Sequence, residues 1–208
     1  MLSSQTSTTT STTRTALFTL DGLAQRSHDE LDALYRTAKV STSMHAADGA
    51  LIGRMLAVKG LPPMIGGPLR RWAESSSFVW EGKSFEASSD TQGMGFNRVN
   101  GASVLGRQNL FPFATSFGPS AIDGKPTLIL DYDLAVNPGY IRHVHDEVRE
   151  VSPGVFLGPA MWKSGPKKIM ILWFALDATR AARSRPATWA SSPTSVSASA
   201  SRGCISRC

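Results

Sequence analysis

Short apolar runs separated by turn residues occupy the middle of the chain. They are bounded by Gly, Pro, Asn, Asp or Ser, and breaks recur at short intervals. Strands of antiparallel barrels and sandwiches have this length and spacing. We therefore predict about eight strands, two of which form a hairpin around Pro153 and Gly154. The predicted strands are 50–58, 78–85, 97–105, 109–117, 127–132, 146–151, 155–162 and 169–176.

Helical patterns are few. Ser27 and Glu30 have the spacing of a capping box, and apolar residues at helical intervals follow them as far as about Lys39. Shorter helical pieces are expected at 69–73 and in the turn that leads to Val144. Because helices do not alternate with strands, the pattern argues against a parallel α/β sheet. The expected fold is mainly β, an antiparallel lipocalin-like barrel with a short N-terminal helix.

Low-complexity sequence flanks this patterned region. Residues 1–26 form a leader rich in Ser and Thr, and residues 178–208 form a tail of Arg, Ala, Ser, Thr and Pro. Neither segment can bury enough apolar surface to offset the entropy of ordering, so we expect both to be disordered. The sequence thus predicts one barrel domain at 27–177. The leader could alternatively be a transit peptide, and the tail reads like an out-of-frame or mis-spliced translation.

The net charge of +6 would suggest a nucleic-acid partner if it lay on the domain. The tail, however, holds five arginines and no acidic residue, so most of the charge lies outside the domain. A nucleic-acid reader needs a basic face on the fold itself, and we therefore expect no such partner.

Both cysteines, Cys204 and Cys208, also lie in the tail. The predicted domain therefore has no disulfide, no cysteine nucleophile and no cysteine-based zinc site. This is compatible with a reducing compartment, and we expect a cytoplasmic protein. No apolar run approaches the ~18 residues of a membrane span, so no membrane partner is expected.

Residues 80–85, Trp-Glu-Gly-Lys-Ser-Phe, resemble the W-x-G-K-x-F segment of bacterial and fungal proteins with a GXWXG domain. Residues 131–133, 148–151 and 157–158 are similar to a second block of that family, with its Y-D, F-R-x-V and L-x-G elements. The opening G-x-W-x-G differs, because 49–53 contains no tryptophan. The resemblance spans roughly 51–162. It implies a lipocalin-like barrel and no particular activity.

The strand that begins near Asp146 carries the most conspicuous charges. Period-two geometry places Glu147 and Arg149 on one face and Asp146 on the other. If Glu147 and Arg149 point inward, they mark a ligand site, in which Arg149 suits a carboxylate or phosphate. The other interpretation is a solvated outer face.

Lys83, Asp131 and Tyr132 form a second candidate set. Lys83 lies in an otherwise apolar strand, and Asp131 ends another. A Lys83–Asp131 pair that closes the barrel is one interpretation. General acid or base chemistry by Asp131 or Tyr132 is the other.

Aromatic and histidine residues leave further choices open. Trp80 and Trp162 lie beside charged residues and could line a pocket or belong to the core, whereas Phe85 and Phe174 are expected in the core. His143 and His145 could bind a metal or haem, but no other histidine is near them in sequence. We expect no metal and no cofactor.

The sequence favours a small-molecule binding protein whose ligand is a hydrophobic or acidic metabolite. The alternative is a cofactor-free isomerase, lyase or hydrolase, and the sequence does not decide whether any reaction is catalysed. A homodimer is also left open. The catalytic candidates are Asp131, Tyr132 and Glu147, and the ligand-binding candidates are Trp80, Lys83, Asp146, Arg149 and Trp162.

Overall fold

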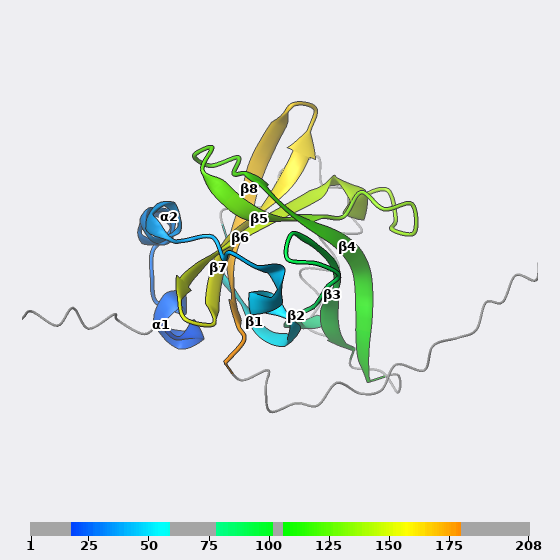
Figure 1. The fold of residues 1–208 in the computed structure, drawn as a ribbon, viewed down its shortest axis with the longest axis horizontal. Coiled ribbons are helices and arrows are strands. Elements are labelled where there is room, and N and C mark those ends of the chain that lie inside the picture. The colour runs from blue at the N-terminus through cyan, green and yellow to red at the C-terminus, as the bar shows by residue number, and fades with distance from the viewer. Residues whose placement is uncertain (1–17, 59–77, 102–105, 180–208) are drawn as a thin grey trace, which may run out of the picture.

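A computed structural model of the protein describes residues 18–58, 78–101 and 106–179. Within these residues, eight strands close into an antiparallel barrel (Figure 1). Each strand pairs with the next one in the chain, and the last pairs with the first. The predicted mainly β fold, with its closed antiparallel barrel, is confirmed. The strands are β1 (Gly49–Val58), β2 (Phe78–Ala87), β3 (Gln92–Gly101), β4 (Arg107–Pro119), β5 (Pro126–Asp131), β6 (Val144–Ser152), β7 (Val155–Ser164) and β8 (Lys167–Asp177).

The start of β3 is the largest difference from the predicted strands. It begins at Gln92 and not at residue 97, because Gly93 and Gly95 weaken the apolar pattern there. The structure shows why a glycine is needed in this strand. A Cβ atom on Gly95 would lie 2.4 Å from the ring of Phe113, which is fully buried. Gly95 therefore makes room for a large aromatic side chain in the barrel.

Two helices, α1 (Leu20–Ala24) and α2 (His28–Thr37), lie against the outside of the barrel on one side (Figure 1). The predicted capping box is confirmed, since Ser27 and Glu30 exchange hydrogen bonds at the start of α2. Helix α1 lies inside the segment predicted to be a disordered leader, so the predicted boundary at residue 27 is too late. Five residues are too few to show a helical period, but Leu23 is fully buried.

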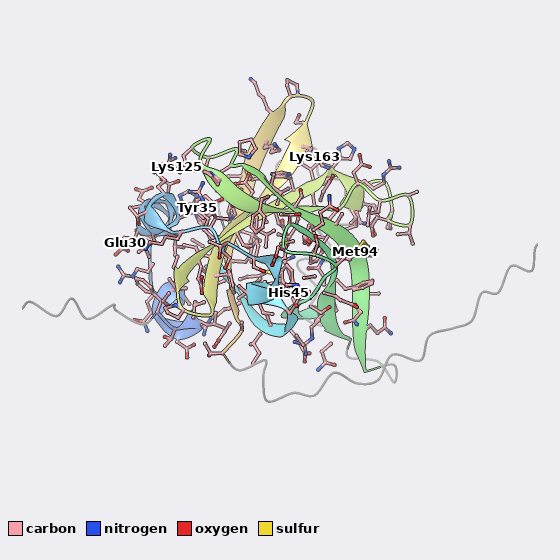
Figure 2. The ribbon with its side chains drawn as sticks, in the orientation of Figure 1. Glu30, Tyr35, His45, Met94, Lys125 and Lys163 are labelled. Atoms are coloured by element: carbon pink, nitrogen blue, oxygen red, sulfur yellow. The ribbon has the colours of Figure 1, made fainter. Side chains whose placement is uncertain are left out.

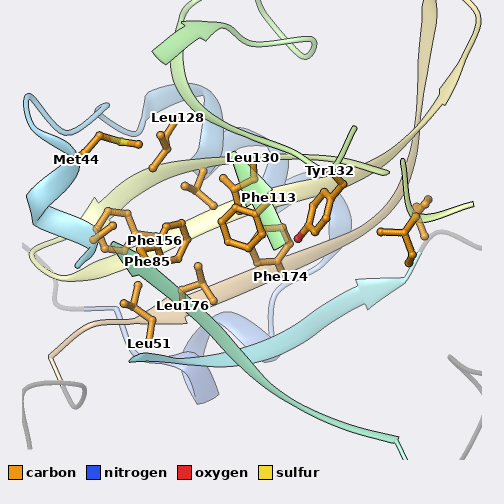
Figure 3. Close-up of a cluster of buried hydrophobic side chains, with 14 of the residues drawn as sticks. Met44, Leu51, Phe85, Phe113, Leu128, Leu130, Tyr132, Phe156, Phe174 and Leu176 are labelled. Atoms are coloured by element: carbon orange, nitrogen blue, oxygen red, sulfur yellow. The ribbon is translucent and has the colours of Figure 1, made fainter. Parts of the chain in front are cut away.

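The lumen has a closed, apolar end. The 3-10 helix η1 (Met44–Ala47) covers it, and Met44 joins a buried cluster with Leu51, Phe85, Leu128 and Phe156 (Figure 3). A second 3-10 helix, η2 (Ile141–His143), precedes β6 and agrees with the predicted helical turn. Apolar side chains therefore fill this end of the lumen.

Several predictions lie outside the described residues. These are the short helix at 69–73, the first part of the leader and nearly all of the C-terminal tail with Cys204 and Cys208. None of the helices in the described part of the chain is long and apolar enough to cross a membrane.

Candidate functional site

A cavity of about 120 Å³ occupies the end of the lumen opposite η1. It lies where β1, β3, β5 and β7 end and the even-numbered strands begin. Its walls are mainly apolar and include Met55, Phe111 and Phe174. Because the Met55 side chain lines the cavity and the residue is 43% exposed, the cavity reaches the protein surface.

Four buried polar side chains form one hydrogen-bonded network in the cavity wall. The Lys83 ammonium donates to Asn97 Oδ1 at 2.8 Å, to the Tyr132 hydroxyl at 2.6 Å and to Asp146 Oδ2 at 2.9 Å. The Tyr132 hydroxyl donates to the same Asp146 oxygen at 3.0 Å, and Asn97 donates to Tyr132 at 3.1 Å. All three ammonium protons of Lys83 are therefore used within the protein.

One carboxylate oxygen of this network has no hydrogen-bond partner among the described residues. It is Oδ1 of Asp146, a residue that is 3% exposed. A buried acceptor without a partner costs about 1–3 kcal/mol, and more when it is charged. This oxygen is itself buried, but Asp146 lines the cavity, so a rotation of the carboxyl group would bring the oxygen to a donor on a ligand.

The surroundings of the network shift two pKa values. Burial lowers the pKa of Lys83, although Asp146 opposes the effect. Burial and the nearby Asp146 carboxylate raise the pKa of Tyr132 well above its usual value, so the phenol keeps its proton. The rings of Trp80, Phe113 and Phe174 also lie around the ammonium, with centroids 5.1 to 5.5 Å from Nζ. Such cation–π contacts offset part of the cost of burying the charge.

Irregular strand pairing surrounds the cavity. Register shifts fall beside four of its lining residues, Met55, Trp80, Asn97 and Ala160. In β4 the extra residue is Phe111, whose φ of 52° is in the left-handed region. Bulges at barrel rims redirect side chains, and such backbone strain, about 1–3 kcal/mol, is typical of binding and catalytic sites. This end of the barrel therefore departs from regular pairing where the cavity lies.

Arg149, a predicted ligand-binding residue, lies outside the lumen. It is 1% exposed and is buried between the barrel and α2, so neither predicted environment, lumen or solvent, is correct. Its guanidinium donates to both carboxylate oxygens of Asp123 at 2.9 and 2.7 Å and stacks 4.4 Å from the ring centroid of Tyr35. Further bonds go to the carbonyl oxygens of Tyr35, Lys125 and Pro126. Two of these residues, Tyr35 of α2 and Lys125 close to that helix, are labelled in Figure 2. The guanidinium donors of Arg149 are therefore used in bonds within the protein.

Glu147, a predicted catalytic residue, shares this outer face and is fully buried. One carboxylate oxygen accepts the Ala121 backbone N–H at 2.7 Å and lies 3.0 Å from His145 Nε2. The other accepts hydrogen bonds from the hydroxyls of Tyr35 and Ser120. Burial raises the pKa of Glu147, but these hydrogen bonds outweigh it, and the pKa is lowered. Glu147 is thus an ionised anchor for α2 and the β4–β5 turn.

Asp131, the other predicted catalytic carboxylate, points away from the lumen. Its side chain is 52% exposed and accepts a hydrogen bond from Lys163 at 2.9 Å. The predicted Lys83–Asp131 pair is therefore wrong, and Asp146 takes that place. Period-two alternation explains the error, because Tyr132 points inward and its neighbour Asp131 must then point outward.

The remaining predicted residues divide between cavity and core. Trp80 lines the cavity and donates to Asn97 at 3.1 Å. Trp162 belongs to the buried cluster and stacks on His143, with ring centroids 5.1 Å apart. His145 contacts Glu147 instead, so the two histidines do not converge. In the described ranges, no group of three or more His, Cys, Asp or Glu is placed to hold a metal ion.

Asn97 is the site residue that the sequence analysis missed. It lies on the same period-two face of β3 as Gly95 and Val99, so alternation alone could have placed it inside the barrel. Its contacts with Lys83 on β2 and with Tyr132, which follows β5, have no sequence signal.

No family model and no curated protein matches this sequence. Among solved structures, a protein from Thermomonospora curvata is similar, with 16% sequence identity and a TM-score of 0.47. The similarity covers 73% of this chain and 87% of that one.

Proposed function

We propose that the barrel binds a small, mainly apolar molecule that carries one hydrogen-bond donor. The observation that carries this proposal is the unpaired Oδ1 of Asp146, a residue that lines a mainly apolar cavity. Ligand sites commonly combine apolar walls with a few polar groups that fix orientation. Here the fixed group is an acceptor, so it selects a hydroxyl, amide or amine.

The size of the cavity limits the ligand. An apolar cavity of about 150 Å³ holds benzene. The space above Lys83 and Asp146, at about 120 Å³, therefore suits a molecule near the size of one aromatic ring. Phenol has this size and carries a donor. Toluene matches it without the donor, and benzoate replaces the donor by an anion.

The charges favour a neutral ligand over the acidic metabolite that the sequence also suggested. Lys83 and Asp146 form an ion pair inside the lumen, and all the Lys83 donors are used. Arg149, the other candidate for an anion, is bound to Asp123. A ligand carboxylate would face the Asp146 carboxylate and be repelled.

A distant relationship to GXWXG-domain proteins stays part of the proposal. The segment that suggested it contributes Trp80 and Lys83 to the cavity wall. If the relationship holds, those proteins would use the same segment for their ligands.

Calorimetric titration of the full chain with phenol, toluene and benzoate tests the function. Phenol should bind more tightly than toluene, and benzoate should not bind. In Asp146→Asn, phenol should lose about tenfold or more in affinity, since a hydrogen bond to a charged group is worth about 1.5–3 kcal/mol. Toluene affinity should stay unchanged in the variant.

The matched control is Asp131→Asn, the same change on an outward-pointing carboxylate. It should leave both affinities unaltered. Thermal melts give a second readout, because a ligand at 100 times its dissociation constant adds about 2.7 kcal/mol of stability. Equal phenol affinity in wild type and Asp146→Asn, or no stabilisation by phenol at saturating concentration, would exclude the proposal.

A further inference from the structure

We propose that Lys83 is a nucleophile that forms an imine with small aldehydes or ketones bound in the cavity. The inference rests on the proposed function, because the carbonyl compound must occupy the same cavity. It goes further by assigning covalent chemistry to one atom, Lys83 Nζ, and a substrate class of small, mainly apolar carbonyl compounds.

The geometry supplies both a nucleophile and a proton carrier. Lys83 Nζ lies 2.9 Å from Asp146 Oδ2, and both side chains line the cavity. The unpaired Asp146 Oδ1 belongs to the same carboxyl group. A carbonyl compound in the cavity would therefore meet Nζ together with a carboxyl group that can hold the proton taken from it.

The surroundings ease the formation of the neutral amine that the chemistry needs. Lys83 is 3% exposed, and the rings of Trp80, Phe113 and Phe174 lie around Nζ. Desolvation disfavours the ammonium form and lowers the pKa of this lysine. Lysines in apolar pockets are the ones that proteins use for imine formation.

The step balances without a co-reactant. The ammonium passes one proton to Asp146, and the amine lone pair attacks the carbonyl carbon while the C=O π electrons move to oxygen. Asp146 returns the proton to that oxygen and gives a carbinolamine with a protonated nitrogen. The nitrogen passes one proton back to Asp146, which delivers it to the carbinolamine oxygen. The C–O bond then breaks, water leaves, and the nitrogen lone pair forms the C=N bond of a protonated imine beside the Asp146 carboxylate. Nothing is oxidised or reduced.

Reductive trapping in the unaltered protein tests the inference. The full chain is incubated with benzaldehyde and sodium cyanoborohydride, which reduces imines to stable secondary amines, and benzylated lysines are located by peptide mapping. Lys163, a partly exposed lysine paired with Asp131, is the internal control. At pH 7, Lys83 should be benzylated faster than Lys163, because burial lowers the pKa of Lys83 and so raises its fraction of neutral amine.

Three further measurements separate this chemistry from surface labelling. Phenol should slow benzylation at Lys83 and leave Lys163 unaffected. The Lys83 rate should level off at a pH below the ordinary pKa of a lysine. Lys83→Met should lose only the Lys83 adduct, and the mapping of wild-type protein decides the question even where this variant does not fold.

The outcomes also distinguish this inference from the proposed function. Phenol binding that depends on Asp146, together with Lys83 labelled no faster than Lys163, would overturn the imine inference and leave ligand binding intact. Absence of phenol binding would remove the proposed function. Rapid labelling of Lys83 that phenol suppresses supports both.

Discussion

Asp146 and Glu147 are neighbours on β6, yet they lie in two different polar networks. Both are carboxylates, 3% and 0% exposed. Asp146 faces the lumen, pairs with Lys83 and keeps one oxygen without a partner. Glu147 faces outward beneath α2, and the protein satisfies both of its oxygens. The alternation of a strand separates the two roles by a single residue.

The networks of Asp146 and Glu147 differ in how completely their hydrogen-bonding groups are paired. Burial and strong pairing are common to both networks, so neither identifies a function. What distinguishes the lumen network is an unpaired carboxylate oxygen on a residue that lines a cavity. In the outer network both carboxylate oxygens of Glu147 are paired, and the groups of this network connect α2 and the β4–β5 turn to the barrel.

Arg149→Met should give the largest stability loss, because it removes one partner of a buried ion pair and leaves Asp123 unpaired. Such changes cost about 3–5 kcal/mol. Urea unfolding measures the effect, and the phenol affinity of the folded variant should match wild type. Arg142→Met, which breaks an exposed pair with Asp133, is the control and should change stability little. Equal losses in the two variants would contradict the assignment of Arg149 as a structural anchor.

Acid should weaken the outer network before the protein unfolds completely. The hydrogen bonds from Arg149 lower the pKa of Asp123 to about 2. Because this folded-state pKa is below the unfolded value, the stabilisation is complete above about pH 4 and is lost as the pH falls toward 2. It amounts to at most about 2 kcal/mol. Free energies of unfolding measured from pH 5 to 2 should fall less steeply in Asp123→Asn, and identical slopes would refute the linkage.

Tyr35→Phe and Tyr132→Phe form a matched pair with the smallest effects. Each removes a buried hydroxyl, and each should cost about 1–2 kcal/mol in thermal melts. Only Tyr132→Phe should reduce the stabilisation by phenol, because the Tyr132 hydroxyl holds the Asp146 carboxylate in place. If Tyr35→Phe weakens phenol binding equally, the two networks are coupled and the distinction drawn between them fails.

Much of the fold could be predicted from local sequence. Turn residues and apolar runs located the strands, and Ser27 with Glu30 marked the start of α2. Alternation correctly placed Glu147 and Arg149 on one face and Asp146 on the other. The start of β3 was missed because Gly93 and Gly95 serve packing, which no local pattern reports.

The candidate site was only partly predictable. Lys83, Tyr132, Trp80 and Asp146 were singled out, and the structure brings all four to the cavity. Their partners could not be assigned, because the barrel register decides which strands face each other across the lumen. The burial of Arg149 depends on α2 covering the barrel, a tertiary contact that the strand sequence cannot show.

The closed ring of strands also limits what the protein can accept. Every strand is hydrogen-bonded on both sides, so the circumference of the barrel is fixed by its ladders. A cleft between two domains can widen by a hinge, but this ring could widen only by breaking backbone hydrogen bonds. If the barrel binds a ligand as proposed, this fixed circumference would limit the width of the ligand whatever polar groups it carries.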